Sequence, residues 1–304
     1  MRRIFITGGT GFFGKSILDY RLRHPEFLAD AELTILSRDP AAFIAANPQL
    51  ANQPGISFVQ GDVRDFTLPD ANFDTVIHAA TAAVTTLSDD EMYSTIVDGT
   101  RHVLDFTKTC DATRILFTSS GAVYGPQIAA VDENAPTNPM TAYGRGKLTA
   151  ERMCIESGIP TMIVRCFAFT GPYLNRRIHY AIGNFIQDCL DGRDIVLKGD
   201  GTPLRSYMYA DDLVEWLFAI LDRGEPGRPY NVGSPEGLSI RELAETVRTA
   251  LGTKNGISIQ GTPQPCNPAT LQPSTYVPIT TRAETELGLS VTVPLAEAIR
   301  KSAQ

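Results

Sequence analysis

A tyrosine and a lysine four residues apart, Tyr143 and Lys147, have the spacing in this sequence that points most directly to chemistry. In a helix this spacing puts both side chains on one face. A phenol with its usual pKa of about 10 is a weak base at neutral pH, but a nearby ammonium favours the phenolate and lowers that pKa. The pair could then exchange a proton with a carbinol whose oxygen is held by the hydroxyl of Ser120. Such pairs are also common on exposed helix surfaces. The spacing alone therefore does not distinguish an active site from a surface pair, and the surrounding sequence must be considered.

The first fifteen residues contain a glycine-rich turn between an apolar run and a helical pattern. Residues 4–6 are apolar, Gly8, Gly11 and Gly14 follow with a period of three, and residues 17–22 have helical spacing. Without Cβ atoms, such a turn lets a pyrophosphate reach a helix N-terminus, where free N–H groups and the helix dipole hold negative charge. A glycine-rich turn without a ligand is the alternative. The order of strand, turn and helix favours a dinucleotide site.

Beyond this turn, short apolar runs alternate with helical patterns. We predict further strands over 32–37, 56–59, 74–78, 114–118 and 160–165. The alternation is typical of an α/β fold with a right-handed, parallel, doubly wound sheet. Ligands of such sheets bind beyond the carboxyl ends of the strands, where the glycine turn and Ser120 both lie.

The alternation ends near residue 171, and this break predicts two domains. We expect a dinucleotide-binding domain over 1–170, completed by 196–199 and 207–234, and a smaller α/β substrate lobe, mainly 171–304, assembled from discontinuous pieces. Residues 253–280 contain many prolines and little periodicity, which predicts a surface loop.

Composition restricts the partners of the chain. The 304 residues carry a net charge of −7 without a basic run, so we expect neither nucleic acid nor a membrane as a partner. The five cysteines are scattered and form no CxxC, which indicates a reduced, cytoplasmic chain without a metal site. No signal peptide precedes the first strand, and no apolar run has the length of a membrane span.

Several motifs together resemble the extended short-chain dehydrogenase/reductases, that is, the NAD-dependent epimerase/dehydratase family. They are TGGTGFFG (7–14), GDV (61–63), HAAT (78–81), SSGAVYG (119–125), YGRGK (143–147) and RCFAFTGP (165–172). The stretch GDGTPLRSYMYADD (199–212) is similar to the branch that acts on nucleotide sugars. The resemblance covers nearly the whole chain. It implies a Rossmann domain with a small C-terminal substrate lobe, a tightly held nicotinamide dinucleotide, and a homodimer packed through two helices of each subunit.

The resemblance also implies a role for individual residues. Tyr143 would be the acid/base, Lys147 its partner and a ribose ligand, and Ser120 the hydroxyl of the triad. Asn184 could contact the substrate, although an exposed helical asparagine would look the same. Cofactor contacts are expected from Gly8, Gly11, Phe12, Phe13, Gly14, Ser37, Arg38, Asp62, Val63, Ala79, Ala80, Thr81, Thr118, Tyr143, Lys147 and Cys166.

Arg205 is the expected clamp on the diphosphate of the sugar nucleotide, because a guanidinium binds phosphate with two parallel hydrogen bonds. The alternative is an ion pair between Arg205 and Asp211 or Asp212. For these two acids we favour a simpler role, since either could cap the helix that begins there.

The sequence departs from the family pattern at four positions. Nucleotide-sugar dehydratases place an acidic pair directly after the catalytic hydroxyl, and Gly121 and Ala122 stand there instead, so we discount 4,6-dehydration. Ile96 and Ala168 replace two family asparagines, and the second change removes a common diphosphate contact.

The cofactor prediction depends on the end of the second strand. An acid there binds the ribose hydroxyls of NAD, whereas an arginine suits the 2′-phosphate of NADP. Ser37 and Arg38 provide a hydroxyl and a cation, so we expect NADP(H) rather than NAD(H), although Arg38 stacked on adenine would serve either.

The reaction expected from these features is reduction of a nucleotide-activated 4-keto-6-deoxyhexose, a step of deoxysugar biosynthesis. The alternative is a nucleotide-sugar 4-epimerase with tightly bound NAD, which uses the same triad. A catalytically silent NADP sensor of the same fold is disfavoured, because Ser120, Tyr143 and Lys147 are all present.

Overall fold

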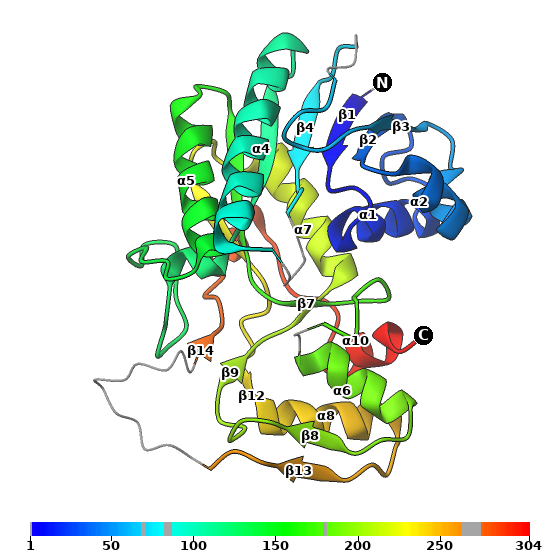
Figure 1. Ribbon diagram of the computed structural model, residues 1–304, viewed down its shortest axis with the longest axis vertical. Helices are drawn as coiled ribbons and strands as arrows, with labels where there is room; N and C mark the ends of the chain where they lie inside the picture. Colours follow the sequence, from blue (N-terminus) through cyan, green and yellow to red (C-terminus); the bar gives the residue numbers. More distant parts are fainter. Residues whose placement is uncertain (1, 68–70, 82–86, 179–180, 263–274) are drawn as a thin grey trace. The chain divides into compact units, whose positions relative to one another are not determined.

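A computed structural model describes residues 2–67, 71–81, 87–178, 181–262 and 275–304, and divides the chain into two compact units (Figure 1). Unit 1 comprises residues 1–125, 137–165 and 214–230. Unit 2 comprises residues 126–136, 166–213 and 231–304.

Unit 1 is built on a seven-stranded parallel sheet, of which only the last residues of two strands belong to unit 2. The strands are β1 (Arg2–Thr7), β2 (Ala31–Ser37), β3 (Ile56–Gln60), β4 (Thr75–His78), β5 (Arg114–Ser120), β6 (Thr161–Cys166) and β11 (Pro229–Val232). Their order is β11-β6-β5-β4-β1-β2-β3, so the direction of winding reverses between β1 and β4. This order confirms the predicted doubly wound Rossmann fold.

The register of β1 with its two neighbours positions the site. Ile4 pairs with Leu33 of β2 on one side and with Thr75 of β4 on the other, and Thr7 pairs with His78. The carboxyl ends of β1 and β4 therefore lie together, which places the glycine turn after Thr7 beside the turn after His78.

Helices cover the sheet, so the central strands are apolar throughout rather than alternating. The helices are α1 (Phe12–Arg23), α2 (Pro40–Ala46), α3 (Pro48–Ala51), α4 (Asp89–Thr109), the 3-10 turn η1 (Gly121–Tyr124), α5 (Ala142–Glu156) and most of α7 (Ala210–Arg223). Under α4, the rings of Phe5 and Phe106 lie 4.6 Å apart in a buried aromatic cluster. Helices α4 and α5 lie side by side (Figure 1), and a Cβ on Gly146 would come within 3.2 Å of Ile96.

Unit 2 is held together by α6 (Ala181–Leu190), α8 (Ile240–Leu251) and α10 (Leu295–Ser302), which share an apolar core. Ile186, Leu243 and Ile299 are fully buried in it. The remaining elements are β7 (Phe169–Thr170), β8 (Ile195–Leu197), β9 (Leu204–Arg205), β10 (Met208–Tyr209), β12 (Leu238–Ser239), β13 (Ile257–Ile259), β14 (Thr275–Tyr276) and α9 (Thr281–Leu287).

Two local predictions in unit 2 are wrong in part, and both fail because the partner is distant in sequence. Residues 253–280 are predicted to form a loop, but β13 pairs in parallel with β8, with Ile257 opposite Ile195, while residues 263–274 of this stretch lie outside the described residues. Of Asp211 and Asp212, either of which could cap a helix, Asp212 does not, because α7 begins at Ala210 and the carboxylate accepts hydrogen bonds from Thr292 and from the backbone N–H of Val293. Among the described helices none combines the length and apolar character that a bilayer span requires.

Candidate functional site

The predicted acid/base pair lies at the start of α5, and its lysine is deeply buried. The hydroxyl of Thr141 caps the helix by accepting the N–H of Gly144 at 3.1 Å. Lys147 is 1% exposed, and its Nζ donates to the carbonyl of Thr118 at 2.7 Å. The same Nζ lies 6.0 Å from the ring centroid of Tyr143. The structure thus brings three predicted residues together and shields the ammonium from water, which strengthens its interaction with charges nearby.

Ser120 ends β5 and is fixed by the turn that follows. Its buried Oγ accepts the N–H of Ala122 at 3.1 Å, which caps η1. Gly125 closes the turn with φ of 73°, and a Cβ there would lie 2.0 Å from the carbonyl oxygen of Asn138. The turn therefore orients the Ser120 hydroxyl, and Gly121 and Ala122 bring no carboxylate to it.

The glycine turn fits a dinucleotide pyrophosphate. Gly8 has φ of +75°, and a Cβ there would lie 2.5 Å from the backbone of Ala79. Gly11 precedes α1, whose N-terminus has no side-chain cap and no acid in its first turn. A Cβ on Gly14 would lie 2.1 Å from the Cα of Gly9. The start of α1 therefore has neither a capping side chain nor an acid that would compete with an anion, which fits a pyrophosphate at this turn.

A neutral histidine organises the neighbouring turn, where Ala79, Ala80 and Thr81 are predicted to line the cofactor groove. His78 Nδ1 lies 2.8 Å from the hydroxyl of Thr7, and its Nε2 lies 3.0 Å from the hydroxyl of Thr100. Because Thr100 donates its proton to the carbonyl of Ile96, it accepts from Nε2–H, so Thr7 donates to Nδ1. Burial, with a smaller contribution from Lys147, lowers the pKa of His78 to about 3. The imidazole is therefore structural.

The hydroxyl of Thr7 extends this network to the groove itself. Its Oγ1 accepts the backbone N–H of Ala80 at 3.2 Å, and the N–H of Ala79 donates to the Thr7 carbonyl at 3.1 Å. His78 thus fixes the backbone of the turn through Thr7.

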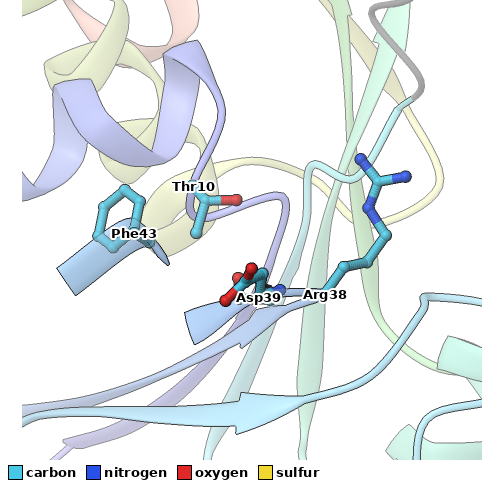
Figure 2. Close-up of a pocket in the computed structure, with 5 residues that line it drawn as sticks. Thr10, Arg38, Asp39 and Phe43 are labelled. Carbon is cyan, nitrogen blue, oxygen red and sulfur yellow. Dashed lines mark hydrogen bonds between the residues drawn. The ribbon is translucent and has the colours of Figure 1, made fainter. Parts of the chain in front are cut away.

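A pocket of about 490 Å³ lies beyond β2 and contains both residues used for the cofactor prediction. Thr10, Ser37, Arg38, Asp39 and Phe43 line it. Figure 2 shows the guanidinium of Arg38 extending away from the carboxylate of Asp39. That carboxylate caps α2 by accepting the N–H of Ala42 at 2.9 Å. Asp39 is a pocket residue that was not predicted from the sequence, although its position directly after Arg38 could have indicated it.

Asp62, the predicted adenine contact, is held by an arginine two residues later. Its Oδ1 accepts from the Nε of Arg64 at 2.7 Å and from the backbone N–H of Arg64 at 3.1 Å. These hydrogen bonds, aided by the charges of Arg64 and Arg38, outweigh partial burial and lower the pKa of Asp62. The carboxylate is thus an oriented acceptor, and Val63 beside it packs against Gly99 of α4.

Three predicted site residues belong to unit 2. Cys166 is buried at the end of β6, and Arg205 in β9 donates from Nη1 to the carbonyl of Leu204 at 2.7 Å. With its amide oriented to satisfy its neighbours, Asn184 donates to the carbonyls of Arg176 and Ile178 at 2.9 and 3.2 Å. Asn184 therefore fastens the preceding loop to α6, a function that the sequence analysis did not assign.

Comparison with known proteins supports the motif-based resemblance. Residues 4–233 match the model of the NAD dependent epimerase/dehydratase family. The Low-salt glycan biosynthesis protein Agl12 of Haloferax volcanii is 30% identical over 263 residues, covering 82% of each chain. UDP-glucuronic acid decarboxylase 1 of Xenopus tropicalis is 28% identical over 320 residues, covering 99% of this chain and 71% of that one.

Solved structures share the fold along the whole chain. A dTDP-glucose 4,6-dehydratase from Bacillus anthracis, in complex with NAD, has a TM-score of 0.83 at 19% identity and covers 100% of this chain and 96% of its own. A UDP-glucuronic acid 4-epimerase from Bacillus cereus, in complex with UDP-glucuronic acid and NAD, has a TM-score of 0.84 at 22% identity, with 99% and 98% covered. At these identities the likeness establishes the fold alone.

Proposed function

The chain belongs to the NAD dependent epimerase/dehydratase family, and we propose that it catalyses hydride transfer at C4 of a nucleotide sugar. The observation that carries this proposal is the buried ammonium of Lys147, held on the carbonyl of Thr118 at the side of Tyr143. Such an ammonium stabilises a phenolate at neutral pH, which a surface pair would not do. The nucleotide-sugar names of several relatives support the same substrate class.

A bound nicotinamide supplies the hydride acceptor or donor in this family of reactions. The residues of the chain move the proton. In the reducing direction the phenol of Tyr143 gives its proton to the C4 oxygen as that oxygen gains negative charge, and Lys147 stabilises the phenolate that remains. The Ser120 hydroxyl, oriented by Ala122, would donate to the same oxygen.

The specific reaction we propose is reduction of a nucleotide-activated 4-keto-6-deoxyhexose. Gly121 and Ala122 leave the position after Ser120 without a carboxylate, which favours a reaction that needs only the triad. A 4-epimerase is the second candidate, because several solved neighbours bear that name. It would retain its cofactor through two opposite hydride transfers, whereas a reductase must release the oxidised cofactor.

The two candidates differ in what the purified protein carries. We expect no copurifying dinucleotide in the absorbance spectrum and in the supernatant of the denatured protein, and we expect oxidation of added NADPH with a nucleotide-activated 4-keto-6-deoxyhexose. Stoichiometric NAD released only on denaturation, with interconversion of C4 epimers, would replace the reductase by the epimerase. No turnover with keto sugars, UDP-hexoses or UDP-glucuronic acid would contradict the proposal of C4 chemistry.

We also propose a preference for NADP(H), in which Ser37 and Arg38 receive the 2′-phosphate. Replacing Arg38 with methionine should weaken NADPH binding about tenfold or more and leave NADH binding nearly unchanged, because one charge-assisted phosphate contact is lost. Asp39→Asn provides the matched test in the same pocket, since removal of this negative charge should strengthen NADPH relative to NADH. Fluorescence titrations measure both ratios. Equal weakening of both cofactors by Arg38→Met would instead indicate stacking on adenine.

For its assembly we propose a cytoplasmic homodimer packed through α4 and α5. Tyr93 on α4 and Ile155 on α5 are large apolar side chains that are 37% and 54% exposed in the single chain. The four described cysteines are buried thiols, which fits a reducing compartment. Light scattering should give the mass of two chains, and a monomer at micromolar concentration would contradict this proposal.

A further inference from the structure

A buried ion pair lies behind the proposed acid/base residues and has no place in the mechanism above. Glu151 of α5 accepts from Nη2 of Arg165 at 2.8 Å and from Nε at 3.1 Å, and Arg165 belongs to β6. The side chains of Arg165 and Glu151 are only 8% and 5% exposed. The guanidinium also lies 4.9 Å from the ring centroid of Tyr124, so its planar face is covered as well.

The same carboxylate holds the strand that carries the catalytic hydroxyl. Glu151 accepts a short hydrogen bond from the hydroxyl of Ser119, and Lys147, one turn earlier on α5, donates to the carbonyl of Thr118. Two successive residues of β5 are therefore fastened to α5 immediately before Ser120. A shift of either element would change the distance between Ser120 and Tyr143.

Stability alone does not explain this pair. Desolvation of two charges offsets most of their attraction, so apolar residues of similar volume would often serve a core equally well. A carboxylate on the same helix face as Lys147 would moreover oppose the effect of that ammonium on Tyr143, unless another cation cancelled it. The charges of Glu151 and Lys147 both act on the buried side of α5, where Cys154 lies. Burial raises the pKa of the Cys154 thiol to about 12, and the charge of Glu151 also raises it, whereas the charge of Lys147 lowers it.

We propose that Glu151 and Arg165 are positioning residues for the acid/base pair. Glu151 fixes α5 on β5 through Ser119, and Arg165 cancels the negative charge of Glu151, so that the ammonium of Lys147 acts on the phenol of Tyr143 undiminished. The inference rests on the proposed role of Tyr143 as acid/base.

Two other ionisable groups near Lys147 are neutral, so Glu151 and Arg165 determine the balance of charge around this lysine. From β4, His78 is held neutral by burial, with a pKa of about 3. The Cys154 thiol on α5 is also neutral, because its pKa is raised to about 12. In the described part of the chain, the ionisable groups that interact with Lys147, Glu151 or Arg165 include Tyr143 and Cys154 on α5, His78 on β4 and Tyr124 on η1.

The ionisation of Tyr143 tests the proposal without any substrate. Ultraviolet difference spectra between each variant and its Tyr143→Phe counterpart isolate this tyrosinate as a function of pH. Glu151→Gln leaves the cation of Arg165 uncompensated and should lower the pKa of Tyr143, whereas Arg165→Met leaves the carboxylate and should raise it. Over the roughly 12 Å that separate positions 143 and 151 along a helix, a unit charge shifts a pKa by about one unit.

The double variant Glu151→Gln/Arg165→Met, which buries no unpaired charge, should return the pKa of Tyr143 close to its original value. If one single variant fails to fold, the other single variant and the double variant still test the proposal, because the shift of the single variant and its reversal in the double variant are both required. The control is Asp222→Asn, which removes the same charge from a surface pair with Arg2 at the amino end of β1 and should not shift Tyr143. Shifts of the two single variants in the same direction, or no shift in any variant, would overturn the proposal, because a purely structural pair has no reason to change sign.

Turnover provides a second readout once a substrate is known. Reduction needs the protonated phenol of Tyr143, so the alkaline limb of the kcat profile reports its pKa. This limb should move down with Glu151→Gln and up with Arg165→Met, while KM for the nucleotide sugar changes little. If no nucleotide sugar is turned over, the proposed function fails, but the tyrosinate titration still decides whether the pair controls Tyr143.

Discussion

Replacement of Tyr143 by phenylalanine is expected to lower turnover about a thousandfold or more while the fold is retained. The change removes only the hydroxyl, which is the proton donor and acceptor in the proposed reaction. The ring, partly buried against the core cluster of unit 1, keeps its packing, and Lys147 keeps its hydrogen bond to the carbonyl of Thr118. We therefore expect unchanged circular dichroism and a melting temperature within a few degrees of the original, together with loss of NAD(P)H-linked turnover.

Tyr93→Phe is the matched control, because it removes a hydroxyl from the neighbouring helix α4. That hydroxyl lies 3.2 Å from Oγ1 of Thr149 and is exposed in the single chain, and phenylalanine keeps the apolar ring that the proposed dimer contact would use. The control should retain full turnover, so a loss of activity common to both variants would point to damage of the helix pair. Full activity of Tyr143→Phe would disprove the acid/base role and the reaction built on it.

The features that the sequence predicts well are formed by residues that lie close together along the chain. The glycine turn is foreseen because Gly8, Gly11 and Gly14 stand between an apolar run and a helical pattern, and the backbone confirms that turn. The spacing of Tyr143 and Lys147 likewise predicts a shared face, because both lie in one helix.

The interactions that the sequence does not reveal join residues that are far apart. Lys147 meets the carbonyl of Thr118, a backbone group that has no signature in the sequence. Asp212 looks like a helix cap, yet its carboxylate binds residues 80 and 81 positions later. Arg165 and Glu151 come from a strand and a helix, and neither local pattern demands a buried charge. Tertiary packing decides these contacts, and local propensity cannot.

Gly14→Ala should have the second large effect, loss of dinucleotide binding together with a decrease of about 3 kcal/mol or more in the free energy of unfolding. An alanine in a helix interior is normally favourable by about 1 kcal/mol relative to glycine. Here its Cβ would lie 2.1 Å from both the Cα and the carbonyl oxygen of Gly9. Because these are backbone atoms, α1 or the turn must move, and the N–H groups that should hold the pyrophosphate move with them.

Gly199→Ala is the control, because its Cβ would meet nothing within 4 Å and its backbone does not lie in the left-handed region. Chemical denaturation and NADPH titration of both variants separate the two parts of the prediction. Loss of binding with little loss of stability would contradict the stability part of the prediction and would mean that the turn yields while the sheet remains intact. Original affinity in Gly14→Ala would show that the pyrophosphate does not bind at this turn, and the assignment of the cofactor site would then be wrong.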